Sequence, residues 1–325
     1  MLKLIKLIVL LGIAGSCYAQ QDTQYSQYIF NGIYINPAYA GFRERVNINA
    51  TYRNQWTGVE DSPESFSLAA DALMPNGRVG LSLIVNAEQL GPQKNITAFG
   101  NYAYRMPLNE EGTTKLAFGL GLGFRQSALN GEMLKPKDLG DNFIPNGTIK
   151  QILPDMNTGV FFSTPSMYVG AAVNNLIGAY VLQKKSLEFN FPTPRPHFYL
   201  TGGALIPIEE YVIDFKPFFL IKDDLKGPTM LDINAFLLFK QKVWLGVGYR
   251  TGVKLYEKPN LPNNINSSNA LIGMTELFVN QRFRLGYSYD HNLSSLSGYA
   301  GATHEISLSW NFFTEKERRL NFCYF

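Results

Sequence analysis

The chain has little charge, almost no cysteine and, after its first 20 residues, no long apolar run. Only 17% of its 325 residues are charged, whereas an ordinary soluble domain carries about 25%. No apolar run beyond residue 20 reaches the roughly 18 residues that a membrane helix needs, which excludes a helical membrane protein. With 46% hydrophobic residues and a net charge of only +3, the chain is not disordered either. The composition is instead rich in tyrosine, phenylalanine and glycine.

Residues 1–19 resemble a secretory signal peptide. Lys3 and Lys6 form a basic start, residues 7–13 are apolar, and small residues up to Ala19 form a cleavage site. Removing the two lysines leaves a nearly neutral mature chain, so no basic surface for nucleic acid is expected. The sequence therefore predicts an exported protein that begins at Gln20.

The two cysteines carry little structural information. Cleavage after Ala19 would leave only Cys323, so no disulfide can form within the chain. A second interpretation makes Cys17 a lipoprotein cysteine. The residues before it lack the leucine usual at such a site, which favours the plain signal peptide.

Beyond the first 44 residues, apolar and polar side chains alternate with a period of two, as in strands with one apolar face. In residues 304–312, for example, Ile306 and Leu308 alternate with Glu305 and Ser307. Most such segments have about 10 residues, the length that a tilted strand needs to cross a bilayer. Fourteen strands are predicted, near residues 45–55, 64–73, 78–89, 95–106, 113–128, 156–164, 166–174, 196–208, 211–221, 228–239, 242–251, 269–279, 281–290 and 303–313.

The connections between these strands alternate in length. Six short turns, such as residues 75–77, are interleaved with seven longer links, such as residues 129–155 and 252–268. This rhythm places the long loops at one rim and the short turns, with both termini, at the other, as in outer-membrane barrels. The predicted fold class is therefore all-β, a closed antiparallel transmembrane barrel.

The second face of the predicted strands carries too many charges for the dry core of a secreted β-sandwich or propeller, the alternative folds. A water-filled lumen accepts such charges, whereas a dry core does not. Ile84, Phe99, Phe236 and Trp244 fall on the same face, which indicates that they pack against something inside the barrel. The charges expected to face the lumen include Arg105, Arg125, Asp232, Arg250, Arg282, Arg284 and Glu305.

Three glycines alternate along one predicted strand and do not form a phosphate loop. Gly119, Gly121 and Gly123 would instead allow the N-terminal segment or a neighbouring chain to approach closely. We also expect Gly119→Ser to cost far less stability than a charge at the lipid-facing neighbour, as in Leu120→Arg.

The sequence contains no recognisable catalytic or metal-binding spacing. His197, His291 and His304 stand apart, and no HExxH, CxxC or GxSxG pattern occurs. A non-enzymatic protein without a cofactor is expected.

Residues 20–44 precede the alternating region and contain six aromatic residues. Asn36 is restricted to extended geometry by Pro37, and Gly41 permits a left-handed residue before the first strand. The segment is too apolar for a free tail, so it either returns into the barrel from the periplasmic side as a plug or forms a short periplasmic arm. The predicted organisation is a signal peptide (1–19), this segment (20–44), the barrel (45–313) and a periplasmic tail (314–325).

Several blocks of the mature chain resemble the PorP/SprF membrane proteins of the Bacteroidetes type IX secretion system. The best-defined are Asn36-Pro37-Ala38 with Gly41, and Tyr52-Arg53-Asn54-Gln55-Trp56. Asn-Pro-Ala alone also occurs in fatty-acid-transporter-like barrels, so the order and spacing of the blocks carry the resemblance. Further blocks lie at residues 24–31, 75–81, 153–160, 168–170, 196–198, 244–250, 285–290 and 304–306.

The resemblance implies a subunit of the type IX secretion and gliding machinery in the outer membrane. Its implied partners are outer-membrane lipid, periplasmic ring lipoproteins of the system, and the C-terminal domain of a secreted surface protein or adhesin. The predicted barrel fold by itself is also compatible with a second function, a FadL-like or porin-like channel for small hydrophobic or polar solutes. The candidate contacts for a partner or the plug are Asn36, Pro37, Ala38, Gly41, Tyr52, Arg53 and Trp56.

Overall fold

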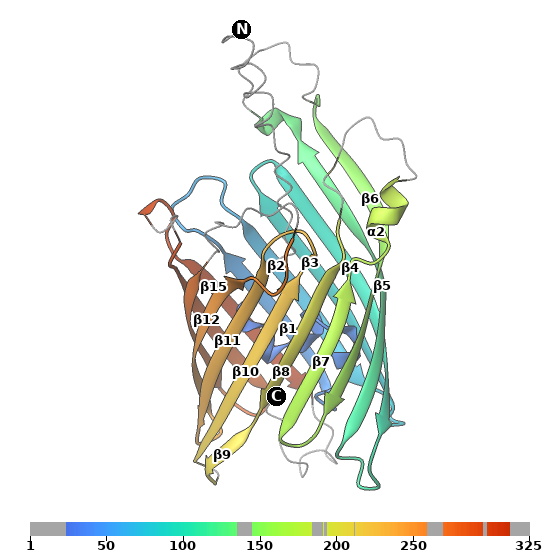
Figure 1. Cartoon of the computed structure of the whole chain (residues 1–325), viewed down its shortest axis with the longest axis vertical. Coiled ribbons are helices and arrows are strands. Elements are labelled where there is room, and N and C mark those ends of the chain that lie inside the picture. Colours follow the sequence, from blue (N-terminus) through green and yellow to red (C-terminus); the bar gives the residue numbers. More distant parts are fainter. Residues whose placement is uncertain are drawn as a thin grey trace.

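The chain folds into a closed antiparallel β-barrel, seen from the side in Figure 1. The computed structural model describes residues 24–134, 145–183, 191, 194–210, 212–258, 269–294 and 298–312. Fifteen strands form one sheet, which closes where β10 pairs with β11. Because β8 and β9 follow one another along the same side of β10, the wall has fourteen positions, as predicted.

The strands match the predicted segments closely. Those from the first half of the chain are β1 (Val46–Asn54), β2 (Glu64–Leu73), β3 (Val79–Leu90), β4 (Gln93–Pro107), β5 (Lys115–Asn130), β6 (Thr148–Ser163) and β7 (Met167–Asn174). The others are β8 (His197–Ala204), β9 (Ile206–Glu209), β10 (Ile213–Asp223), β11 (Thr229–Phe239), β12 (Val243–Val253), β13 (Ala270–Phe278), β14 (Phe283–Asn292) and β15 (Thr303–Phe312). The loops carry a short α-helix, α2 (Gly178–Gln183), and a 3-10 turn, η4 (Gly131–Met133).

Strand β6 begins eight residues earlier than the sequence pattern predicted. Its partner β7 covers only Thr158–Ser163, so the preceding part of β6 pairs with β5 alone within the described residues. Pro154 lacks an N–H donor and is tolerated on such an edge. Because proline is rare within strands, this part of β6 was not predicted from the alternation of side chains.

The two faces of the wall have opposite character, as predicted. On β15, Ile306 and Leu308 are 46% and 44% exposed and face outward, whereas Glu305 and Ser307 are buried. The outward side chains form the lipid-facing surface that a membrane barrel requires. No helix among the described residues is both long and apolar enough to cross a membrane.

The connections separate the barrel into a short-turn end and a long-loop end. The short-turn end holds the links of three to seven residues between β2 and β3, β4 and β5, β6 and β7, β9 and β10, β11 and β12, and β13 and β14. The other links lie at the long-loop end, although the expected long link between β3 and β4 is a two-residue turn at Gly91 and Pro92. The predicted signal peptide (1–19) and tail (314–325) lie outside the described residues.

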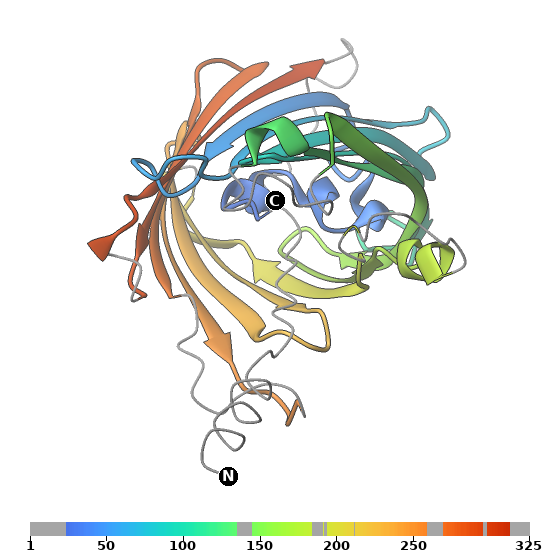
Figure 2. The same cartoon turned by 90° about the horizontal axis from the view of Figure 1, so that it is seen from above.

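Residues 24–44, called here the luminal segment, lie inside the barrel (Figure 2). They form three 3-10 turns, η1 (Gln27–Phe30), η2 (Gly32–Tyr34) and η3 (Pro37–Tyr39). Ser26 contacts the long-loop ends of β14 and β15, and Gly41 lies beside Gly80 at the short-turn end. The segment therefore runs down the bore from the long-loop end. It is joined to β1 at the short-turn end.

Candidate functional site

The luminal segment and the wall residues that hold it form the candidate functional site. Its aromatic and aliphatic side chains are deeply buried, with Tyr28, Ile29, Phe30 and Tyr39 each at most 5% exposed. The segment has no regular long helix, so its conformation depends on contacts with the wall. Four sets of contacts secure it, one near each end and two between them.

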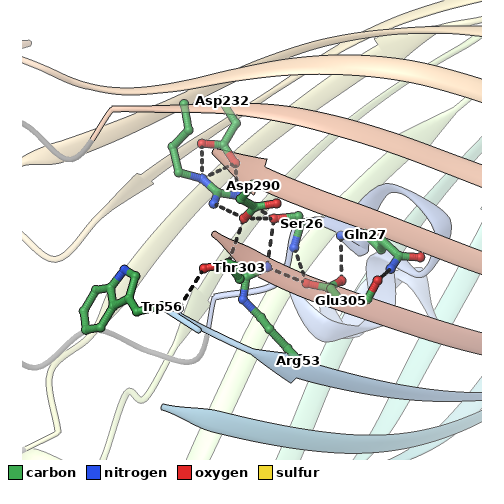
Figure 3. Close-up of polar contacts among 9 residues, drawn as sticks. Ser26, Gln27, Arg53, Trp56, Asp232, Asp290, Thr303 and Glu305 are labelled. Carbon is green, nitrogen blue, oxygen red and sulfur yellow. Dashed lines mark hydrogen bonds and ion pairs between the residues drawn. The ribbon is translucent and has the colours of Figure 1, made fainter. Parts of the chain in front are cut away.

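Near the long-loop end, five buried charges form the upper ion cluster: Arg53, Asp232, Arg250, Asp290 and Glu305 (Figure 3). The two oxygens of the Glu305 carboxylate accept hydrogen bonds from the backbone N–H groups of Ser26 and Gln27, both at 2.8 Å. The Ser26 hydroxyl donates to Asp290 at 2.6 Å. The first turn of the luminal segment is therefore bound directly by wall carboxylates.

The two arginines of the upper ion cluster link its three carboxylates. Arg53 lies opposite Glu305 in the pairing of β1 with β15 and contacts both Glu305 and Asp290 at 2.8 Å. Arg250 lies opposite Asp232 and contacts its carboxylate at 2.9 Å. Two cations face three anions, and the N–H and O–H donors of the luminal segment offset the remaining negative charge. Buried charges are stable only when paired and hydrogen-bonded in this way.

Aromatic rings from the wall enclose the middle of the luminal segment. Phe30 packs edge-on against Phe236, with ring centroids 5.3 Å apart, and Tyr28 contacts Phe218 at 5.9 Å. Trp244 packs against Phe236 in turn. Of the inward apolar residues noted in the sequence, Ile84, Phe236 and Trp244 are buried in one cluster with the segment, and Phe99 is buried outside that cluster. This confirms that they pack against something inside the barrel.

Asn36, Pro37 and Ala38 rest on glycines of the wall and form what we call the glycine seat. The Asn36 side chain accepts a hydrogen bond from Ala38 N–H at 2.9 Å, and it donates to the carbonyls of Val160 and Ala171 at 3.0 and 3.3 Å. It therefore caps its own turn and ties that turn to β6 and β7.

The luminal segment can approach the wall closely here because the wall residues are glycines, which have no side chain. A Cβ atom at Gly119 would lie 2.1 Å from the Ala38 nitrogen, and one at Gly159 would lie 2.1 Å from the Asn36 Oδ1 atom. The proposed role of Gly119 is confirmed. The expectation that Gly119→Ser would be mild is wrong, because a side chain there collides with backbone.

At the short-turn end, the chain leaves the lumen through a fourth set of contacts. Gly41 has a left-handed φ of 70°, and its carbonyl accepts a hydrogen bond from Arg105 at 2.7 Å. Glu44 forms ion pairs with Arg105 and Lys115. Burial alone would raise the pKa of the Glu44 carboxyl, but hydrogen bonds and charges from Lys115 and Arg105 lower it.

Other residues singled out in the sequence lie elsewhere. Arg284 is buried and pairs with Glu276 at 3.3 Å. Arg125 lies on the lumen wall and donates to Asn175 at 2.9 Å. Arg282 precedes β14 in an exposed turn, so it does not line the lumen as expected. Arg282 alternates with the inward residues of β14 in the sequence, but it does not face the lumen because the strand begins one residue later.

Two residues of the family motif lie away from the luminal segment. Tyr52 faces outward on β1 and is 43% exposed. Trp56 follows β1 at the long-loop end, with a φ of 53°, and its backbone N–H donates to the Thr303 hydroxyl at 3.3 Å. Of the candidates, Asn36, Pro37, Ala38 and Gly41 belong to the luminal segment and contact the wall. Arg53 belongs to the wall and contacts the segment.

Some residues of the site were not singled out as candidates from the sequence. Ser26, Gln27 and Glu44 lie in or beside family blocks, but nothing in their local pattern indicates a buried ionic role. Asp290 shares the inward parity of Arg284, which could have marked it as a lumen charge. Within the described residues, no cluster of His, Cys, Asp or Glu could hold a metal ion.

The fold and the occupied lumen define an outer-membrane β-barrel, and the solved structures similar to this chain belong to that class. The monoaromatic hydrocarbon channel CymD matches with a TM-score of 0.56 at 10% identity, covering 87% of this chain and 93% of CymD. The toluene transporter TbuX of Ralstonia pickettii gives 0.52 at 11% identity, with 87% and 93% covered. A FadL homologue of Pseudomonas aeruginosa gives 0.50 at 9% identity, with 92% and 96% covered. At these identities the likeness concerns the fold alone.

The chain belongs to the PorP/SprF family of type IX secretion system membrane proteins, whose family model matches residues 17–310. This confirms the resemblance seen in the motifs. Comparison with curated protein sequences found no match.

Proposed function

We propose that this protein is a non-enzymatic subunit of the type IX secretion and gliding machinery that takes part in export or surface attachment of secreted proteins. The family match over residues 17–310 carries this proposal. Its proposed partners are periplasmic ring lipoproteins of the system and the C-terminal domain of an exported surface protein or adhesin. The proposed source is a Gram-negative bacterium of the Bacteroidetes, with residues 1–19 removed on export.

The occupied lumen supports a role in binding partners more than one in bulk transport. The luminal segment fills the bore with buried aromatic side chains, and its Ser26 and Gln27 backbone N–H groups donate to the buried Glu305 carboxylate at 2.8 Å. A general porin keeps a water-filled passage instead. We propose that the segment serves the barrel as a plug.

The proposed orientation places the short turns in the periplasm and the long loops outside the cell. Protease added to intact cells should then cut only within loops such as residues 131–147, 175–196 or 254–269. Cleavage at the turn around Gly77 without permeabilisation would invert the topology. The same orientation directs Ser26 toward the cell exterior and Glu44 toward the periplasm.

Affinity capture tests the proposed partners. An epitope can be inserted at Gly77, because this turn is exposed and a Cβ there would meet no atom within 4 Å. We expect the tagged full chain to retain an exported surface protein and periplasmic lipoproteins in detergent. Recovery of the folded barrel without any secretion component would contradict the proposal.

The fold likeness to a toluene transporter and a monoaromatic hydrocarbon channel favours a second candidate function, a channel for small solutes. Planar bilayers separate the two. We expect the whole protein to conduct ions poorly and a variant lacking residues 22–35 to conduct more while remaining a folded barrel. High conductance or toluene uptake by the unaltered protein would favour the channel.

A further inference from the structure

A polar cavity of about 80 Å³ lies between the luminal segment and the wall, in the half of the lumen nearer the long-loop end. The luminal segment contributes an apolar floor that includes Ile33, Ile35 and Pro37. Inward residues of strands β3 to β8 form the sides. A single buried water needs about 10–15 Å³ on the same measure, so the cavity admits a ligand of several heavy atoms.

The sides of this cavity are lined by carboxamide groups to an unusual degree. Each carboxamide offers two N–H donors and one oxygen acceptor without carrying charge. The six asparagines are Asn86, Asn95, Asn101, Asn157, Asn174 and Asn175.

Two of these carboxamides retain unused hydrogen-bonding capacity. The Oδ1 atom of Asn174 has no partner, although the residue is only 8% exposed and its Nδ2 group donates to the Ile35 carbonyl at 3.1 Å. The half-buried Asn95 side chain makes no hydrogen bond to another described residue. A buried acceptor without a partner costs free energy, which a bound donor would recover.

Aromatic faces border the same cavity. Tyr25 and Tyr34 stack on each other with ring centroids 5.0 Å apart, and Tyr199 also lines the cavity. Rings beside carboxamides match a ligand with apolar C–H faces and a rim of hydroxyl groups, because the C–H faces pack on rings and the hydroxyls both donate and accept.

The charges in the lining disfavour an ionic ligand. Glu88 and Arg125 contribute one charge of each sign, and Arg125 already donates to Asn175. A purely apolar ligand such as toluene is also disfavoured, because it would bury carboxamides without partners. A neutral ligand rich in hydroxyl groups remains.

We propose that this cavity binds a neutral sugar ring, either as a free saccharide or as the terminal unit of a surface glycan. This site goes beyond the proposed role in secretion, because it requires no protein partner. Binding would contact both the wall and the luminal segment through Asn174.

The test uses the full-length protein in lauryldimethylamine oxide, because glucoside and maltoside detergents would compete for the site. Saturation-transfer NMR with glucose, galactose, mannose and N-acetylglucosamine should detect binding of at least one sugar. Core oligosaccharide released from outer-membrane lipopolysaccharide forms a second arm, which distinguishes a glycan source from a free saccharide. Absence of binding in both arms would overturn the proposal.

Matched variants locate the site. Asn95→Ala and Asn174→Ala should each weaken sugar binding by about tenfold, the effect of losing one net hydrogen bond. Asn311→Ala should not, because Asn311 also carries a buried Oδ1 without a partner but lies near the short-turn end of β15, outside the cavity. Equal binding by all three variants would place the sugar elsewhere and overturn the assignment.

A peptide control tests the competing ligand class. If N-acetyl-trialanine amide binds with the same dependence on Asn95 and Asn174 and no sugar does, the cavity recognises peptide and the saccharide assignment is wrong. Affinity capture with the same variants keeps the two proposals separate. A variant that loses sugar binding but retains its protein partners would bear on the cavity alone and not on the proposed role in secretion.

Discussion

The luminal segment is held by different forces at the upper ion cluster and at the glycine seat. Ser26 and Gln27 are bound by buried carboxylates that two arginines neutralise. Asn36 and Ala38 are bound by hydrogen bonds and by backbone contact with Gly119. The first contact depends on charge balance, the second on the absence of a Cβ atom. Substitutions that change charge should therefore disturb the upper end, and substitutions that add volume should disturb the seat.

The largest effect is expected from breaking the upper ion cluster. Arg53→Met would leave Glu305 buried without a cation, and loss of one partner in a buried pair costs about 3–5 kcal/mol. Heat-dependent gel mobility of the folded barrel should show a large drop in thermal stability.

Arg282→Met is the matched control for Arg53→Met, because it removes the same positive charge at an exposed position. Arg282 lies in an exposed turn, so its removal should change stability by about 0.5 kcal/mol or less. Equal effects of the two variants would mean that the upper ion cluster does not hold the luminal segment.

A smaller effect is expected at the glycine seat. Gly119→Ser places a Cβ against the Ala38 backbone and should cost about 1–3 kcal/mol, as overpacking does. Displacement of the segment should also raise ion conductance in planar bilayers.

Gly100→Ser provides the control on the neighbouring strand. Gly100 faces outward, and a Cβ there would meet no atom within 4 Å. Its conductance should match that of the unaltered protein. If both serine variants behave alike, close packing at Gly119 does not seat the segment.

Asn36→Ala should weaken the seat without adding volume. It removes the cap of η3 and two bonds to the wall, a loss of about 1–2 kcal/mol. Hydrogen exchange at the Ala38 amide should become faster, whereas exchange at Ser26 should change little. Faster exchange at both ends would show that they are one cooperative unit.

The smallest effect is expected at the short-turn end and depends on pH. Because the pKa of Glu44 is lowered in the folded chain, its ionised form adds stability above the ordinary carboxyl pKa of about 4.3 and loses it as the pH falls. Glu44→Gln should thus lower thermal stability at pH 7 and have little effect at pH 3. A difference that persists at pH 3 would exclude the ion pairs as its cause.

Strand positions and wall polarity were predictable because alternation is a local property of the chain. Glu305 and Ile306 reveal their faces from sequence alone. The upper ion cluster was not predictable, because Ser26 and Asp290 are 264 residues apart in the chain and meet only when the barrel closes. The position of the first turn of the luminal segment depends on that same contact, so the sequence predicted a plug or an arm without predicting where that turn binds.

The course of the luminal segment gives it a mechanical reach. Its first turn lies near one end of the lumen, whereas Glu44 joins it to β1 at the other. Twenty-one residues span about 70 Å when extended, more than twice the roughly 30 Å of a membrane's hydrocarbon core. Once detached from Arg53 and Gly119, the segment would remain attached only at the short-turn rim. It would be long enough to leave the bore and extend beyond that rim.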